Sequence, residues 1–314
     1  MVNVILIRVL RAAAVFLVVT FATFAIVYAK PAAIARNIVG ISATDEAVQA
    51  QVVELGLDRP LLEQYRHWLV DLLHGDFGQS FFTGQPVLST LDLRFPVTLS
   101  LMLISLALTV VVSVVVGVVS AVRGGWPDRL LQILSVVGGA VPSFVVAIGL
   151  VFTFAIAIRA FPATGYVSPD VSLTGWAASI TLPVTAILVG SIAGAAAQFR
   201  SAVKEVLERD FVRTLRARGI PERTIVYRHV LRNAGGPGLM VLSLLTIGLL
   251  GGVVIIEQVF ALPGMGALVT GAASQGDIPV VMGCVAVTVL LVSVVNLLTD
   301  VLTVALNPKA RASS

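Results

Sequence analysis

The chain has 314 residues, of which 57% are hydrophobic and only 12% are charged, and its formal net charge is +4. Soluble domains average about 25% charged residues, so this composition excludes an ordinary soluble protein and indicates an integral membrane protein. In such a protein the basic excess is expected in the loops rather than on a nucleic-acid-binding surface. The single cysteine, Cys284, excludes a disulfide framework and a cysteine-based metal site.

Six apolar segments are long enough to cross a bilayer as helices, which takes about 20 residues. Arg8 and Arg11 precede the core of the first segment, as in a signal peptide, but this core is long and no clear cleavage site follows. We therefore expect a retained helix, and the sequence predicts an all-α fold of six transmembrane helices. The six segments lie at roughly 5–28, 98–122, 130–158, 176–198, 237–259 and 280–306.

The basic residues of the loops predict the orientation of the chain. With the N-terminus inside, the cytoplasmic segments hold 15 of the 21 basic residues and the external segments hold six. Because cytoplasmic loops are enriched in Lys and Arg, both termini are expected in the cytoplasm. The expected parts are a first transmembrane helix at 1–29, a polar external insert at 30–97, and a five-helix core at 98–314 with a cytoplasmic loop at 199–236.

The cytoplasmic loop carries nine basic residues within positions 200–232. Apolar residues recur there at every fourth position before a glycine, which predicts one amphipathic helix that the glycine caps and Pro221 prevents from continuing. A second helical stretch, "ERTIVYRHVLRN", leads back to the membrane. The first helix can lie on anionic lipid or dock into the groove of a soluble partner, and spacing alone does not separate the two. The repeating positions are Leu207, Phe211, Leu215 and Gly219.

Four sequence motifs, which occur in the same order in one known family, favour the docking interpretation. The loop segment "FVRTLRARGIPERTIVYRHVLRNAGGP" resembles the cytoplasmic loop of permease subunits of binding-protein-dependent ABC importers, in the dipeptide/oligopeptide/nickel branch. Three further segments resemble the same branch: "LGLDRPLLEQYRHWLVDLLHGDFGQSFFTGQPV" (55–87), "EQVFALPGMGALVTGAASQGDIPVVMG" (257–283) and "VNLLTDVLTVALNPKAR" (295–311). The segment "YAKPAAIAR" (28–36) departs from the Pro-Gly-Asp-Pro element that relatives often show.

The resemblance implies a channel-forming permease of the cell (inner) membrane that imports peptides by alternating access, and no catalysis by this chain. Its implied partners are a second homologous permease, one or two cytoplasmic ATPase chains and an external substrate-binding protein. No cofactor is expected in this chain, and ATP and Mg would be bound by the ATPase. The residues that match the ATPase-docking coupling helix are Phe211, Arg213, Thr214, Leu215, Arg216, Ala217, Gly219 and Pro221.

The lysines of the chain agree with a nucleotide site on another chain. A Walker A loop needs a glycine before its lysine, so that backbone amides can cradle the phosphates. The three lysines here follow Ala29, Val203 and Pro308, so the sequence contains no such loop.

Helix breakers and one intramembrane acid suggest where the translocation path lies. Breaks in a span are tolerated where neighbours or water satisfy the freed backbone groups, and they allow bending; a static packing kink is the alternative. Glu257 opens a family-like motif near the external end of the fifth span, where it is either part of a gate or an interfacial carboxylate. The path and gate candidates are Gly138, Gly139, Pro142, Pro183, Glu257 and Pro263.

Several alternatives stay open at this point. His67, Asp71 and His74 share one face of a predicted external helix, a spacing that offers three metal ligands but also arises by chance on a polar face. The chain could also be a self-contained channel or secondary transporter, or a nickel or glutathione importer permease of the same branch.

Overall fold

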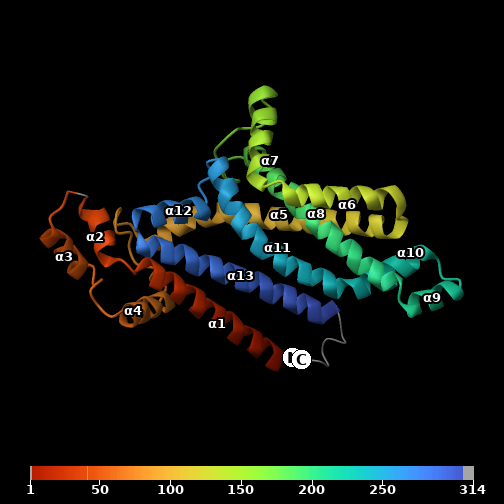
Figure 1. Ribbon diagram of the computed structural model, residues 1–314, viewed down its shortest axis with the longest axis horizontal. Coiled ribbons are helices and arrows are strands. Elements are labelled where there is room, and N and C mark those ends of the chain that lie inside the picture. The colour runs from red at the N-terminus through yellow and green to blue at the C-terminus, as the bar shows by residue number, and fades with distance from the viewer. Residues whose placement is uncertain (1, 41, 307–314) are drawn as a thin grey trace. The chain divides into compact units, whose positions relative to one another are not determined.

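The computed structural model describes residues 2–40 and 42–306; for residues 2–5, 235–244, 247, 250 and 300–306 it describes only the helices to which they belong. In these described ranges the chain forms helices and no strand, apart from one isolated bridge between Gln79 and Pro86 (Figure 1). The expected all-α class is confirmed. The end of the last family-like motif, 307–311, lies outside the described residues.

Within the described residues, four helices are long and apolar enough to cross a membrane: Leu6–Val27, Val87–Arg123, Leu173–Leu207 and Ile278–Thr299. The predicted third span is not one straight helix, because Gly125–Ala140 and Ser143–Ala157 meet at a bend of 93°. The predicted fifth span falls within a helix whose side chains at 235–244 lie outside the described part, so the count of six stays a prediction.

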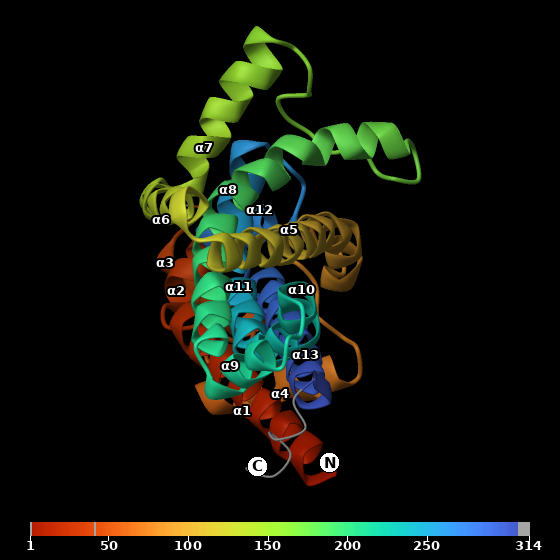
Figure 2. The ribbon, with the colours of Figure 1, turned by 90° about the vertical axis from the view of Figure 1, so that its right-hand side faces the viewer.

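The contacts divide the chain into two units, and the first is built on Leu99–Leu262. At its centre, α8 packs against α6, α7 and α11, and Figure 2 shows α7 turning away from α6 at the bend. Ser172 starts α8 by accepting a hydrogen bond from the Gly175 amide at 3.1 Å. The elements of this unit are the end of α5 (Val87–Arg123), α6 (Gly125–Ala140), α7 (Ser143–Leu150), the π-helical η1 (Val151–Ala157), α8 (Leu173–Leu207), α9 (Asp210–Ala217), α10 (Glu222–Thr224), the π-helical η2 (Ile225–Val230) and α11 (Leu231–Val259).

Pro183, one of the predicted helix breakers, lies inside α8 and does not end this helix, and its place on the translocation path stays a prediction. Proline removes one intrahelical hydrogen bond but does not by itself end a helix whose neighbours hold it in place. Pro183 is buried, and so are Leu182 and Val184 beside it. The packing of the first unit therefore maintains the helix at this point.

The second unit is built on Ile5–Thr98 and Pro263–Ser293. Its aromatic core contains Phe24 and Tyr65, whose rings meet edge to face at 5.4 Å, and the Tyr65 hydroxyl hydrogen-bonds the Thr20 hydroxyl at 2.9 Å. The predicted helix that carries His67 and Asp71 is present as α4, and His74 is its C-cap residue. The elements are α1 (Val2–Val27), α2 (Pro31–Val39), α3 (Asp45–Glu54), α4 (Leu61–Leu73), the start of α5, α12 (Met265–Gln275) and the start of α13 (Ile278–Leu306).

Candidate functional site

The periodicity of the basic loop predicted one continuous amphipathic helix through Leu207, Phe211 and Leu215, and this prediction is wrong. α8 ends at Leu207, and α9 begins at Asp210 after a break at Glu208 and Arg209. Arg209, with extended backbone, occupies the N-cap position of α9, and Asp210 places a carboxylate in the first turn, where the helix dipole favours negative charge. Lys204 and Glu205 therefore belong to α8 rather than to the docking helix.

The apolar face of α9 packs on the chain itself. Val212 is fully buried, and Phe211 and Leu215 are partly buried against the same hydrophobic cluster. This cluster, which we name the loop cluster, joins α5, α8, α9, η2 and α11, so it fixes α9 to the helices of the first unit. Its buried members are Ala121, Val203, Val206, Val212, Ile225, Val230 and Ala234.

The polar face of α9 is the one left exposed. Arg213, Thr214, Arg216 and Ala217 are exposed, and the Arg213 side chain is 74% exposed. The interpretation of the apolar stripe is thus corrected: three of its residues, Leu207, Phe211 and Leu215, pack against the loop cluster and stabilise the loop from inside. Any partner that approaches α9 from the exposed side meets a basic and polar surface.

The C-terminus of α9 is closed by a glycine in the left-handed conformation. Gly219 has φ +73°, its amide donates to the Arg216 carbonyl at 2.9 Å, and the Ile220 amide donates to the Leu215 carbonyl at 3.2 Å. This pair of bonds is a Schellman motif, which satisfies carbonyls that the helix end leaves free. The predicted cap at Gly219 is confirmed.

A bidentate ion pair spans the same turn. Arg216 donates to the carboxylate of Glu222 at 3.0 and 2.5 Å. These hydrogen bonds hold the pKa of Glu222 below its ordinary range and raise the pKa of Arg216. Arg216 is therefore part of the architecture of the loop, and Arg213 is its more freely exposed neighbour.

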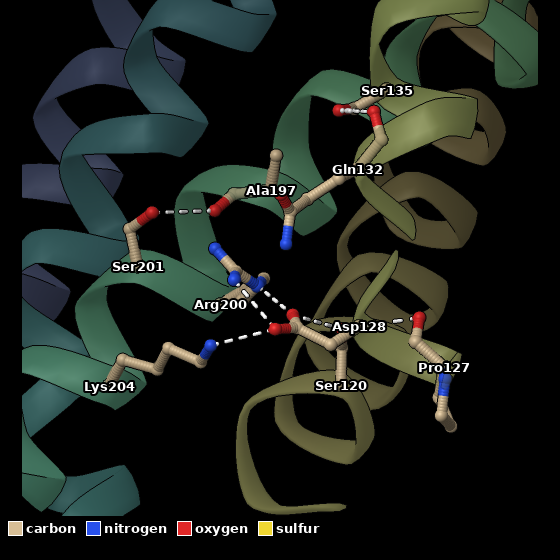
Figure 3. Close-up of polar contacts among 9 residues, drawn as sticks. All are labelled: Ser120, Pro127, Asp128, Gln132, Ser135, Ala197, Arg200, Ser201 and Lys204. Atoms are coloured by element: carbon tan, nitrogen blue, oxygen red, sulfur yellow. Dashed lines mark hydrogen bonds and ion pairs between the residues drawn. The ribbon is translucent and has the colours of Figure 1, made fainter. Parts of the chain in front are cut away.

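A buried carboxylate joins α6 to α8, as Figure 3 shows. Asp128 of α6 accepts hydrogen bonds from Arg200 Nε and from an Arg200 Nη at 2.8 Å, and from Lys204 Nζ at 2.8 Å. The Ser120 hydroxyl donates a further bond at 3.1 Å. Asp128 is 8% exposed, so two of the nine basic residues assigned to the loop are instead bound to an acid within the helices. We name this group the Asp128 clamp.

Sequence reasoning missed Asp128. The residue lies 72 positions before Arg200, and no periodicity links two such positions. The available signal was its position near the start of a predicted span, one turn before the apolar stretch, where a carboxylate in hydrocarbon needs a partner.

The bend between α6 and α7 lies at the predicted breakers. Gly138 and Gly139 are in the last turn of α6, and Pro142 is the N-cap of α7. A Cβ at Gly138 would lie 2.8 Å from the Ala193 Cβ of α8, so this glycine permits the close approach of the two helices. At Gly139 nothing lies within 4 Å of such a Cβ.

A cavity of about 330 Å³ lies beside this bend, within the first unit. Its lining is uncharged and rich in small residues, and its polar groups are the side chains of Ser143, Ser191 and Gln198. The other described lining residues are Ile187, Gly190, Leu245, Gly248, Leu249 and Gly252. Pro183 is not among them. The predicted path residues Gly138, Gly139 and Pro142 are next to the cavity in sequence, one to five positions before Ser143.

The gate candidates lie at the end of α11 and after it. Glu257 is buried, and its carbonyl accepts the Leu262 amide at 2.8 Å. The turn that follows places Ala261 at φ +48°, a left-handed conformation that is strained for a residue other than glycine. Pro263 lies in the segment before α12. A role for Glu257 and Pro263 in a gate stays a prediction.

His67, Asp71 and His74, the predicted metal ligands, are not brought together at one site. His67 and Asp71 both line a cavity of about 630 Å³ in the second unit, but His74 is absent from its lining, and its Nδ1 lies 2.8 Å from the Val70 carbonyl. In the part of the chain that the structure describes, no three His, Cys, Asp or Glu residues are grouped so that they could hold a metal.

A third buried acid, Asp277, joins two of the family-like motifs within the second unit. Asp277 of "GDIP" accepts a hydrogen bond from the Ser80 hydroxyl at 2.5 Å and one from the Phe81 amide at 3.1 Å. Ser80 is the last residue of "GDFGQS", and Phe81 follows it directly. Ser80 also caps the following turn, where its oxygen accepts the amides of Phe82 and Thr83. Two motifs far apart in the sequence are thus one structural element.

Two family models of membrane transport proteins match this chain. Residues 113–312 match the family of binding-protein-dependent transport system inner membrane components, and residues 1–102 match the N-terminal part of the membrane components of such systems. The chain belongs to this family. It is a multi-pass inner-membrane permease of the peptide/nickel branch of ABC transporters, a transporter subunit rather than an enzyme.

Three relatives illustrate the similarity across nearly the whole chain. A Brucella abortus (strain 2308) protein named as a peptide transport system permease is 38% identical over 305 residues, which cover 97% of each chain. An Escherichia coli (strain K12) protein named as a D,D-dipeptide transport system permease is 35% identical over 309 residues, 91% of each chain. The glutathione transport system permease protein of Pectobacterium atrosepticum is 34% identical over 318 residues, 99% of each chain.

Proposed function

We propose that this chain is one membrane subunit of an ATP-driven importer for peptides, and that it receives mechanical work from a separate ATPase through α9. The observation that carries the proposal is the direction in which α9 faces. Its apolar side is fixed to the loop cluster, and its polar side, with Arg213, Thr214 and Ala217, is exposed. A short helix held firmly on one side and free on the other suits a rigid contact with a moving partner.

The cargo is proposed to pass the cavity beside the α6–α7 bend. Small and uncharged lining residues present little that would select among side chains, while Ser143, Ser191 and Gln198 offer hydrogen-bonding groups to a peptide backbone. Selection of the cargo is then left to the external binding protein. A second homologous permease would complete the channel, and ATP and Mg would be bound by the ATPase chains.

The proposed orientation places both termini and the 199–236 loop in the cytoplasm and the 30–97 insert outside. Along the sequence, the first transmembrane helix at 1–29 precedes this insert and the core at 98–314 follows it. ATP binding would close the ATPase dimer and move α9 with it, and hydrolysis would return the channel to its inward-facing state.

The test is purification of the tagged chain from native membranes in mild detergent, followed by mass spectrometry of its stoichiometric companions. A P-loop ATPase and a second permease in the same complex would support the proposal. A chain that purifies alone and transports without ATP would instead be a self-contained channel or secondary transporter.

Glutathione is a second candidate cargo, because one relative named as a glutathione permease covers 99% of the chain. Competition in proteoliposomes separates the two. A dipeptide that is imported and that glutathione does not displace supports peptides, whereas preferential glutathione uptake supports the alternative.

A further inference from the structure

We propose that Asp128 locks α6 to the C-terminal half of α8, so that a movement of the loop is passed to the α6–α7 bend beside the cavity. Asp128 would thus be a positioning residue for transport. This inference rests on the proposed function, because an ATP-driven importer is what would move the loop.

The first argument is the geometry of the clamp. Arg200 and Lys204 are separated by one turn of α8, and both bind the carboxylate of Asp128 (Figure 3). Arg200 approaches with two nitrogens, which fixes the angle as well as the distance between the helices. Ser120, near the end of α5, adds a third element to the same carboxylate.

The second argument is the environment of the charges. The Asp128 side chain is 12% exposed and the Arg200 side chain is 18% exposed. The Asp128–Arg200 pair is mostly shielded from water and is screened less than an exposed pair, whereas the Lys204 side chain is 35% exposed and partly solvated. Removal of the acid would leave the Arg200 cation without its carboxylate in a mostly buried place. The clamp is therefore expected to persist while the two helices move.

The third argument is the position of the clamp along α8. Val203 and Val206, on the same turns as Lys204, belong to the loop cluster that holds Val212 of α9. Gln198, two residues before Arg200, lines the cavity. The clamp thus lies between the loop and the cavity on one continuous helix.

The fourth argument is a second attachment of α6 to α8. Gly138 approaches Ala193 so closely that its own Cβ would not fit, and its carbonyl oxygen lies 3.8 Å from a Cβ built at Gly190. Two fixed points ten residues apart on α6 prevent it from rotating against α8. Because α6 ends at Ala140, the movement is expected to be absorbed at the bend, at Val141 and Pro142.

The test uses the complete importer in proteoliposomes, with its ATPases, second permease and binding protein. Asp128→Asn is expected to assemble and hydrolyse ATP, but to move about tenfold less peptide per ATP hydrolysed. The matched control is Glu205→Gln. It removes a carboxylate of α8 that pairs with the exposed Arg209, and it should leave the ratio unchanged. A merely structural acid would lower the amount of complex and not this ratio.

Charge exchange checks that the pair acts as a unit. Asp128→Arg combined with Arg200→Asp is expected to recover a higher ratio than either single substitution. An Asp128→Asn importer that retains the full ratio would overturn the inference while leaving the proposed function intact. A wild-type complex without ATP-driven uptake would instead overturn the proposed function.

A measurement on the unaltered clamp covers the case in which Asp128 variants do not fold. Spin labels at Gln132→Cys in α6 and Ser201→Cys in α8, with Cys284→Ala, report the separation of the two helices by dipolar broadening. The separation is expected to be the same with and without ATP. A change of separation during the cycle would show that α6 and α8 do not move together, and the proposal would fail.

Discussion

Arg216 and Glu222 form a two-pronged ion pair across the turn that ends α9, with nitrogen–oxygen distances of 3.0 and 2.5 Å. The turn between them contains Gly219, the left-handed residue that closes the helix. Three residues thus hold the shape of this turn, the Arg216–Glu222 pair and Gly219, and all three are exposed.

The two exposed arginines of α9 should affect the ATPase for different reasons. Arg213→Glu should weaken co-purification of the ATPase more at low than at high salt, because it reverses an exposed surface charge whose ion pair with Asp210 is long, at 3.6 Å. Arg216→Glu should weaken it by opening the turn, so Glu222→Arg should rescue Arg216→Glu and not Arg213→Glu. Unchanged co-purification of Arg213→Glu at low salt would mean that this side chain faces only solvent or lipid.

The Arg216–Glu222 pair should respond to acid. The hydrogen bonds from Arg216 lower the pKa of Glu222 in the folded loop, so the pair stabilises the loop above the unfolded pKa of glutamate, and this contribution is lost as pH falls through the folded pKa. The carbon-13 shift of the Glu222 carboxyl should titrate below that of a glutamate in a short peptide. Arg216→Gln should restore the ordinary midpoint, and an ordinary midpoint in the wild type would contradict the pair.

Gly219 allows a test of what approaches the loop. Nothing lies within 4 Å of a Cβ built there, so the chain itself has room for a side chain and the cost within it is about 1 kcal/mol for the left-handed conformation. Gly219→Trp should therefore insert and fold but abolish uptake, because only a docked partner would collide with it. Gly219→Ala is the control for conformation alone. Normal transport by Gly219→Trp would contradict docking at this helix end.

The sequence predicted the elements better than their contacts. Turn residues such as Gly219 act through local backbone preferences, so the cap was predictable, and the Gly138–Pro142 breakers located the bend. Periodicity showed that Phe211 and Leu215 share an apolar face, but it cannot tell a face that meets a partner from one that packs on its own chain. Asp128 was missed because its partners lie 72 and 76 residues away, a pairing that only the fold brings about.

Asp277 should control the order of the loop at 76–86. Asp277→Ala removes the acceptor of two hydrogen bonds, from the Ser80 hydroxyl and from the Phe81 amide. The loss of these hydrogen bonds is expected to destabilise this loop by about 1–3 kcal/mol. Limited proteolysis between residues 76 and 86 in detergent should then accelerate. Asp277→Asn keeps an oxygen for the Phe81 amide and should be the milder change. Equal protease resistance of Asp277→Ala and wild type would show that the loop is held by other contacts.

Neighbouring glycines in α6 give a matched pair for the α6–α8 contact. Alanine is the better helix former at either position, so both substitutions gain about 1 kcal/mol in helix propensity. At Gly138 the new methyl would lie 2.8 Å from the Ala193 Cβ and 3.3 Å from the Val189 carbonyl oxygen, and overpacking of this kind costs about 1–3 kcal/mol. At Gly139 it would meet nothing within 4 Å.

Gly138→Ala should therefore lower the temperature of thermal aggregation of the purified importer and Gly139→Ala should not. Gly138→Ala combined with Ala193→Gly should recover the wild-type temperature, since it moves the same methyl to the facing helix. If Gly139→Ala destabilises as much as Gly138→Ala, the surface that matters is one that a partner subunit covers and not the contact with α8.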